Sequence, residues 1–270
     1  MNVRRWIGVT ALAVVVLLID LPALLVISNA FKTRADIQAH SLIPSSFTLE
    51  NFDALGNLPF ARFVLNSFVV AAGGTFVAVL AAVFGGYALS RFRQRGLEGY
   101  SRFLLIVQMV PVVVTLLPLF LVLKHLALLD TYQGLILVYA ALLVPFATWV
   151  GRAFFDSIPA DLEEAAWVDG ASRLSTLVRV VAPLAAPGLV SITVLCFITA
   201  WNEYLLASVF LRDSELLTVG VGLQVFAQQL QSDWGPVMAG SAIAMLPSLA
   251  VYLIFQRYFI SGALAGAVKG

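Results

Sequence analysis

The sequence is poor in the residues from which catalytic and metal sites are built. Its two histidines, His40 and His125, lie far apart, and neither has further metal ligands at a useful spacing. The single cysteine, Cys196, can form neither an internal disulfide nor a cysteine cluster. No grouping of a nucleophile with a general base stands out. We therefore expect no catalytic residue and no metal site, and the chain is not expected to be an enzyme.

Lysine is also scarce, and its positions bear on nucleotide binding. A loop that cradles phosphates has the pattern Gly, four residues, Gly-Lys, and then Ser or Thr. The three lysines, Lys32, Lys124 and Lys269, each follow a residue other than glycine. The chain is therefore not expected to hydrolyse ATP or to hold a cofactor of its own.

Charged residues are few, whereas apolar residues are abundant. The chain is 11% charged and 61% hydrophobic, while soluble domains average about 25% charged and roughly 45–50% apolar. A soluble chain of 270 residues could not bury so much apolar surface in one core, but a bilayer accepts it. The formal net charge of +1 gives no reason to expect a nucleic-acid partner. The composition indicates an integral membrane protein.

Six apolar stretches are long enough to cross the bilayer, which takes about 20 residues as an α-helix. They cover residues 6–27, 63–89, 103–123, 132–150, 184–206 and 234–255. Strands are excluded because an open sheet edge in lipid leaves polar backbone groups unpaired. The first stretch exceeds the 7–15 apolar residues of a secretory signal, so we expect an uncleaved anchor. We predict an all-α membrane protein with six transmembrane helices in a single domain over residues 1–270.

The distribution of lysine and arginine predicts the orientation, because these residues collect on the cytoplasmic side. With the N-terminus inside, eleven of the 16 basic residues fall in inner segments. The five in outer segments are Lys32, Arg34, Arg62, Lys124 and Arg212. An even number of spans then returns the C-terminus to the same side, so both termini are expected to be cytoplasmic.

The inner loop between the fourth and fifth spans begins as a short helix. Pro159 suits a first helical turn, and Asp161 with Glu164 has the spacing of a capping box. Glu163 and Glu164 fall early in this helix, where the helix dipole favours negative charge. Gly170 is expected to end the helix, since glycine readily takes the positive φ of a C-cap.

A second short helix follows in the same loop. Ser172 is placed to cap it, and Leu174, Leu177, Val178 and Val181 then form an apolar stripe at helical spacing. A helix–turn–helix with exposed acids and an apolar stripe has two interpretations. It either packs on its own helix bundle or offers a docking surface to a soluble partner, and the residues alone leave both open.

The same loop resembles the signature loop of ABC-importer permeases. That pattern is Glu-Ala-Ala, three residues, Gly, nine residues, Ile, any residue, Leu, Pro. The corresponding residues, at the same spacing throughout, are Glu164, Ala165, Ala166, Gly170, Val180, Ala182 and Pro183. Val180 stands for the isoleucine, and Ala182 for the leucine, which makes that end of the contact smaller.

Three further stretches resemble the carbohydrate branch of these permeases, the maltose-transporter-like subunits. They are residues 162–172, Trp201-Asn-Glu-Tyr-Leu-Leu206 and the C-terminal residues 256–270. The likeness covers nearly the whole chain. It implies the type I ABC-importer permease fold in the inner membrane of a prokaryote, and a function in binding-protein-dependent, ATP-driven sugar import in which this chain forms half of the translocation pathway.

The resemblance also implies partners and a coupling site. The partners are a second, unlike permease, two copies of an ABC ATPase that binds ATP and Mg, and an extracytoplasmic sugar-binding protein. The cytoplasmic coupling loop, residues 152–183, would dock into the ATPase, with Glu164 meeting a basic group there. The residues assigned to this coupling site are Glu163, Glu164, Ala165, Ala166, Asp169, Gly170 and Pro183.

Polar and aromatic groups within or at the ends of the spans are candidates for the substrate pathway. They are Gln108, Thr115, Trp201, Asn202, Glu203 and Tyr204. Sugars need hydrogen bonds to their hydroxyls and flat aromatic faces, which Trp201 and Tyr204 beside Asn202 could supply. The alternative interpretation is an aromatic belt at the membrane interface together with helix-end capping.

Two other function classes are alternatives to a sugar importer. A permease for a non-sugar solute would share the same loop. An ion-coupled secondary transporter would keep ionisable residues at mid-membrane, but Asp20 and Glu203 both lie toward outer ends of their spans.

The resemblance to ABC-importer permeases also implies contacts for two segments outside the spans. The outer loop Phe210–Asp233 would contact the binding protein, and the tail Ser261–Gly270 would approach the ATPase.

Overall fold

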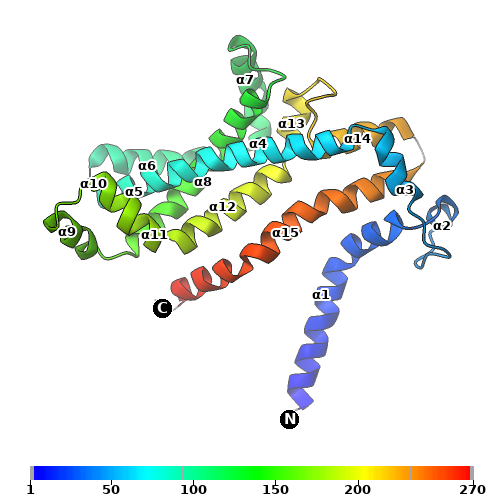
Figure 1. The fold of residues 1–270 in the computed structure, drawn as a ribbon, viewed down its shortest axis with the longest axis horizontal. Helices are drawn as coiled ribbons and strands as arrows, with labels where there is room; N and C mark the ends of the chain where they lie inside the picture. The colour runs from blue at the N-terminus through cyan, green and yellow to red at the C-terminus, as the bar shows by residue number, and fades with distance from the viewer. Residues whose placement is uncertain (1–2, 93, 231–232, 268–270) are drawn as a thin grey trace. The chain divides into compact units, whose positions relative to one another are not determined.

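The structure is a computed structural model that describes the backbone of residues 3–92, 94–230 and 233–267, and the side chains of residues 8–92, 94–229 and 233–256. The described backbone is helical and contains no strand. Figure 1 shows the helices joined by short connections. The last three residues of the tail predicted to approach an ATPase lie outside the described residues, as does Gln231 of the predicted outer loop.

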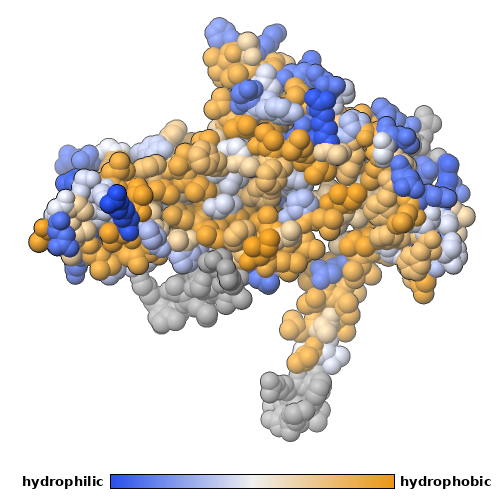
Figure 2. Space-filling view, viewed as in Figure 1, coloured by the Kyte–Doolittle hydropathy of each residue, from blue (hydrophilic) through white to orange (hydrophobic). Residues whose placement is uncertain are grey.

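Four helices are long and apolar enough to cross a membrane. The stretches that qualify are Gly8–Ala30 of α1 (Val3–Ala30), Phe60–Arg91 of α4 (Phe60–Ala81) with its continuation, α8 (Tyr132–Asp156), and Trp234–Gln256 of α15 (Trp234–Ala267). Two bent helix pairs raise the number of spans to six if each pair is one span. The prediction of an all-α membrane protein is confirmed. Hydrophobic residues cover much of the face of the protein that Figure 2 shows.

The helix predicted over residues 103–123 is not continuous. It is divided between α6 (Arg95–Gln108) and α7 (Val112–His125), which meet at an angle of 106°. Pro111 precedes α7 and has an extended backbone, with φ −61° and ψ 131°. Proline lacks the N–H that a continuous helix needs, and it disfavours helical geometry in the residue before it. The helix is therefore interrupted here.

The span predicted over residues 184–206 also differs from a single helix. Its main part is α12 (Ala186–Trp201), after which α13 (Leu205–Phe210) forms a separate turn. A bend of 78° separates α12 from the helical segment Arg173–Leu184 before it. That segment consists of α10 (Arg173–Thr176), a π-helix (Leu177–Val181) and α11 (Ala182–Leu184).

The chain divides into two compact units, of which the first comprises residues 1–62 and 219–246. Besides α1 and the start of α15, it holds α2 (Arg34–Gln38), α3 (Glu50–Asp53), a 3-10 helix (Ala54–Asn57) and α14 (Val219–Leu230). None of the residues in the most apolar part of α1 is buried. With 12 residues, α14 is too short to span a bilayer.

Polar groups fix the segment that follows α1. Asn51 Nδ2 donates to the carbonyl oxygens of Ala30 and Lys32, at 2.9 and 2.8 Å. The buried Lys32 Nζ donates to the carbonyl oxygen of Ser41 at 2.7 Å. A hydrogen bond from the Ser45 hydroxyl lowers the pKa of Asp36. The loop between α1 and α3 is therefore held in a defined conformation.

The second unit comprises residues 63–218 and 247–270. Its central pair is α8 and the helix formed by α4, a π-helix (Ala82–Gly86) and α5 (Tyr87–Arg91). A Cβ added at Gly74 would lie 2.8 Å from Tyr139 Cβ, and one at Gly86 would lie 2.9 Å from the backbone nitrogen of Arg152. Glycine therefore allows the two backbones to approach closely, as small residues commonly do where membrane helices pack together.

Candidate functional site: the loop between α8 and α12

The first helix of the loop, α9, covers Asp161–Val168. Its N-cap is Ala160, whose side chain cannot cap, and the Ala160 carbonyl accepts from the backbone nitrogens of Glu163 and Glu164 at 2.8 and 3.2 Å. The predicted capping box is therefore wrong. The helix starts one residue earlier than that pattern required, so Asp161 lies inside the first turn rather than at the cap position.

Gly170 ends α9 as predicted. Its φ is +87°, and the backbone nitrogens of Gly170 and Ala171 donate to the carbonyls of Trp167 and Ala166 at 3.0 and 2.9 Å. This pair of bonds is the Schellman motif, in which the residue after the C-cap takes the left-handed conformation. The Ser172 hydroxyl then accepts from the Ser175 nitrogen at 3.3 Å, so the predicted cap of the second helix is confirmed.

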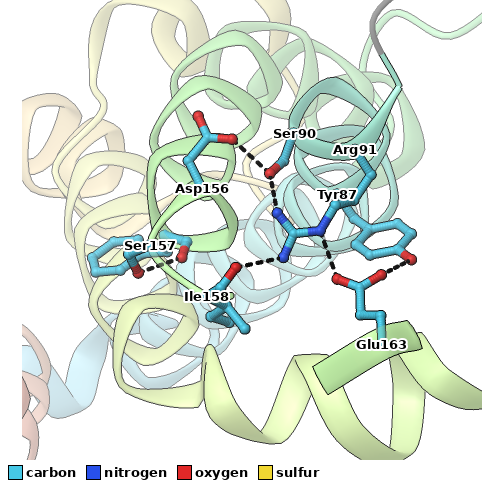
Figure 3. Close-up of polar contacts among 8 residues, drawn as sticks. Tyr87, Ser90, Arg91, Asp156, Ser157, Ile158 and Glu163 are labelled. Atoms are coloured by element: carbon cyan, nitrogen blue, oxygen red, sulfur yellow. Dashed lines mark hydrogen bonds and ion pairs between the residues drawn. The ribbon is translucent and has the colours of Figure 1, made fainter. Parts of the chain in front are cut away.

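The two adjacent glutamates of α9 have opposite environments. Glu164 is exposed, whereas Glu163 is buried with 1% of its surface accessible. The Arg91 Nε and the Tyr87 hydroxyl each donate to one carboxylate oxygen of Glu163, both at 2.6 Å (Figure 3). The expectation that both acids are exposed is wrong for Glu163, because α9 turns this side chain toward the end of α5.

Arg91 connects several parts of the loop. Besides Glu163, its guanidinium donates to the carbonyl oxygen of Ile158 and to the Ser90 hydroxyl, each at 2.9 Å. The Ser90 hydroxyl in turn donates to Asp156 Oδ1 at 2.6 Å. Figure 3 shows these groups converging from α5, the end of α8 and α9. One arginine thus joins three elements.

Sequence reasoning missed Tyr87 and Arg91. No spacing rule relates them to Glu163, because they lie 76 and 72 positions away along the chain. The available signal was a basic residue at the end of an apolar span, which the positive-inside rule explains without any partner. Only the packing of α5 against the loop brings the three groups together.

The apolar stripe of the second loop helix divides between two surroundings. Leu177 and Val181 are buried in a cluster with Tyr87, Phe155 and Ala185, whereas Leu174 and Val178 are 61% and 54% exposed. The inner half of the stripe thus packs on the protein's own helices. The outer half is exposed, and its use as a docking surface stays a prediction.

Most of the other predicted coupling residues share the exposed side of the loop. Ala165, Asp169, Gly170 and Pro183 are exposed, and Ala166 is half-buried. Val168, between Ala166 and Gly170, is 88% exposed. Beside them the Arg173 guanidinium lies over the rings of Phe92 and Trp167, 5.6 and 5.7 Å from the ring centroids. The loop thus presents apolar and acidic groups next to a cation, which suits contact with another protein.

Comparison with known proteins agrees with this geometry. Residues 74–263, which include the whole loop, match the sequence model of the family described as binding-protein-dependent transport system inner membrane component. The chain belongs to this family. The resemblance inferred from Glu164, Gly170 and Pro183 is thereby confirmed at the level of the family, and so is the placement in a membrane.

Known relatives align with this chain over nearly its full length. It is 33% identical to the diacetylchitobiose uptake system permease of Streptomyces coelicolor, covering 99% of this chain and 98% of the relative. It is 35% identical to the trehalose/maltose transport system permease of Thermococcus litoralis, covering 98% and 95%. A chain of a bacterial ABC transporter involved in the import of the acidic polysaccharide alginate superposes with a TM-score of 0.81 at 28% identity, covering 95% and 96%.

The candidate pathway residues of this permease-family chain lie at two helix breaks. Gln108 is exposed at the end of α6, and Thr115 donates to the Val112 carbonyl at 2.7 Å in the first turn of α7. The other four lie where α12 gives way to α13. Among them Tyr204 is 44% exposed, and the exposed Asn202 donates to the Ile198 carbonyl at 2.8 Å.

Glu203 and Trp201 are turned inward at that second break. Glu203 accepts from the backbone nitrogens of Leu206 and Ala207 at 2.8 and 3.1 Å, and from the Tyr139 hydroxyl at 2.9 Å. Trp201 is buried and stacks on Phe197 with 5.8 Å between ring centroids. The alternative of helix-end capping therefore accounts for Glu203, and core packing accounts for Trp201. Within the described residues, no three His, Cys, Asp or Glu side chains gather as a metal site.

Proposed function

We propose that the chain is the membrane-spanning permease subunit of an ATP-driven, binding-protein-dependent sugar importer. It forms half of the translocation pathway and couples to a separate ATPase through α9. The observation that carries this proposal is the exposed side of α9, which ends in the Gly170 turn at the position of the family's signature loop. Sugar as the cargo is supported by relatives named for diacetylchitobiose and for trehalose/maltose.

Hydrolysis of ATP belongs to a partner in this proposal. The sequence has no Gly-Lys pair to cradle phosphates, so ATP and Mg bind to two copies of an ATPase. A second permease completes the pathway, and an extracytoplasmic binding protein delivers the sugar to the side opposite α9. Both termini are cytoplasmic, in line with the excess of basic residues in the inner segments.

Glu164 is the charged group of α9 that we assign to the ATPase contact. Its neighbour Glu163 is already paired within the chain, whereas Glu164 is exposed. Asp161 and Asp169 are exposed as well, so this end of the loop has a negative field that attracts a basic surface. The apolar residues Val168 and Leu174 beside it add area to the contact.

In the pathway, we assign direct sugar contact to the exposed groups, Gln108, Asn202 and Tyr204. Asn202 and Tyr204 together offer an amide and an aromatic face at one helix break. Thr115, Trp201 and Glu203 hold the helices around the breaks and act on the sugar only through this geometry.

The test is reversal of the charge at Glu164. Glu164→Lys should weaken binding of the ATPase by about 100-fold, since a like-charge juxtaposition in an interface costs several kcal/mol, and uptake should be lost. The variant should still insert, and the binding protein should still dock. The matched control is Glu98→Lys, which reverses an exposed charge on α6 outside the loop. Full uptake by Glu164→Lys would contradict the assignment.

The cargo and the energy source are tested on the same preparation. Uptake by the complex that co-purifies with this chain should be blocked by vanadate and should resist an uncoupler. A panel of labelled sugars and amino acids then identifies the solute. Uptake that stops with the uncoupler alone would identify an ion-coupled carrier instead.

A further inference from the structure

We propose that Glu163 is a positioning residue that fixes α9 to the end of the α4–α5 helix, so that movement of the loop moves this helix. The inference rests on the proposed function, because it describes how force from an ATPase enters the membrane helices. It concerns a glutamate that faces the chain's own helices and not the partner. The reasons lie in burial, in hydrogen-bond geometry and in the packing around Tyr87.

Every oxygen of the Glu163 carboxylate has a partner on one helix. Arg91 and Tyr87 are four positions apart on α5, and each binds one carboxylate oxygen at 2.6 Å. The side chain of Glu163 is 1% exposed and that of Arg91 is 15% exposed. Charge-assisted bonds of this length are strong, and loss of one partner leaves the other charge buried without compensation. α9 therefore cannot separate from α5 without exposing or orphaning a charge.

The second half of the loop is attached at the same point. The ring of Tyr87 packs with Phe155, Leu177 and Val181 in one apolar cluster, and its centroid lies 5.8 Å from that of Phe155 in an edge-on arrangement. Tyr87 thus binds α9 through its hydroxyl and the segment leading to α12 through its ring. Both arms of the loop meet on one side chain of α5.

The helix that receives this contact packs closely against α8. Gly74 and Gly86 bring the backbone of α4 and its continuation against α8 near Tyr139 and Arg152. A displacement of α9 applied at Tyr87 and Arg91 is therefore transferred to two long helices together. Arg91 also binds the carbonyl of Ile158 just after α8, which closes the connection between the loop and both helices.

The experiment measures coupling rather than amount of protein. The complete transporter is reconstituted in liposomes with wild-type chain or Glu163→Gln, and ATP hydrolysis and sugar uptake are measured on the same sample. An amide carries no charge, so the bond from Arg91 loses its charge assistance, and the amide nitrogen can only donate to the Tyr87 hydroxyl rather than accept from it. We expect the ATPase to remain bound and the ATP hydrolysed per sugar imported to rise by about two- to thirtyfold, the range seen for positions along coupling networks.

The controls separate positioning from stability. Glu98→Gln removes an exposed charge on α6, outside the loop, and should keep the wild-type ratio. Tyr87→Phe removes one bond to Glu163 while keeping the ring in its cluster, and should raise the ratio as well. If uptake and hydrolysis fall in proportion in Glu163→Gln, or the ratio stays at the wild-type value, the proposal is wrong.

Two further outcomes separate a structural role of Glu163 from a failure of the proposed function. If Glu163→Gln fails to assemble, the ratio of Tyr87→Phe decides, and a wild-type ratio there assigns Glu163 a purely structural role. If the wild-type chain itself binds no ATPase and supports no uptake driven by ATP, the proposed function has failed and not the assignment of Glu163.

Discussion

At the scale of single residues, two neighbouring glutamates of the loop have different roles. Glu163 holds α9 to its own chain through Arg91 and Tyr87, while Glu164 is left exposed on the other side. Successive helical positions differ by about 100° in direction, so adjacent acids can serve different partners. Gly170 then turns the chain back with φ +87°, a conformation that few other residues adopt without strain.

Substitution of Gly170 tests the importance of this turn. Gly170→Asp places a side chain at positive φ, which costs roughly 1–3 kcal/mol of local strain, and it adds a charge beside the docking side of α9. We expect loss of uptake with normal insertion, measured by transport assays and by the amount of chain in the membrane fraction. Gly170→Asn is the matched control, because asparagine and aspartate both tolerate the left-handed region and the two variants differ in charge; it should retain substantial uptake. Equal loss of uptake in both variants would show that the added charge is not responsible, and wild-type uptake in both would show that the turn does not require glycine.

At the scale of elements, the broken helices show where an apolar pattern misleads. Residues 103–123 are apolar enough for one span, yet the chain bends by 106° between α6 and α7. Pro111 was the visible signal for this break. The break after Trp201 has no proline, and instead Glu203 caps the next turn through the nitrogens of Leu206 and Ala207. The Tyr139 hydroxyl, 64 positions away along the chain, also donates to Glu203, and local sequence could not predict this contact.

The close pairing of α4 and α8 predicts a difference between two glycines. In Gly86→Ala the new Cβ would lie 2.9 Å from the backbone nitrogen of Arg152, and backbone cannot move aside cheaply, so we expect a loss of about 1–3 kcal/mol in the free energy of unfolding. Gly99→Ala meets nothing within 4 Å and lies inside α6, where alanine is favoured by about 1 kcal/mol. Thermal unfolding in detergent should therefore show a lower midpoint for the first variant only. A lowered midpoint for Gly99→Ala would contradict this reasoning.

At the scale of the whole molecule, the sequence predicted what depends on composition and local chemistry. Apolar length located the helices, and Gly170 and Ser172 marked the turns of the loop. The link between Glu163 and Arg91 could not be predicted, because it joins groups 72 positions apart whose partners only the fold selects. For Glu203, the structure shows the helix-end capping that was the alternative interpretation, whereas the packing of Trp201 on Phe197 was not predicted.

Orientation in the membrane remains a prediction with a direct test. Single cysteines are introduced into a Cys196-free chain and labelled from outside intact cells with an impermeant reagent. Ser46 and Gln229, both exposed in the first unit, should react. Arg95 and Val168, exposed in the second unit, should react only after the cells are opened. Labelling of Val168 from outside would overturn the orientation and the docking of an ATPase together.

The π-helix at Ala82–Gly86 sets the direction in which the end of the second span faces. A π turn holds one residue more than an α turn, and one residue rotates everything beyond it by about 100° around the helix axis. Tyr87 and Arg91 follow this turn directly, so the extra residue sets the angular phase at which they meet Glu163. Deletion of one residue within Ala82–Gly86 would leave a regular helix whose last turn points in another direction. The number of residues in this helix is therefore set by the direction in which its last turn must face, and not by the thickness of the bilayer that the helix crosses.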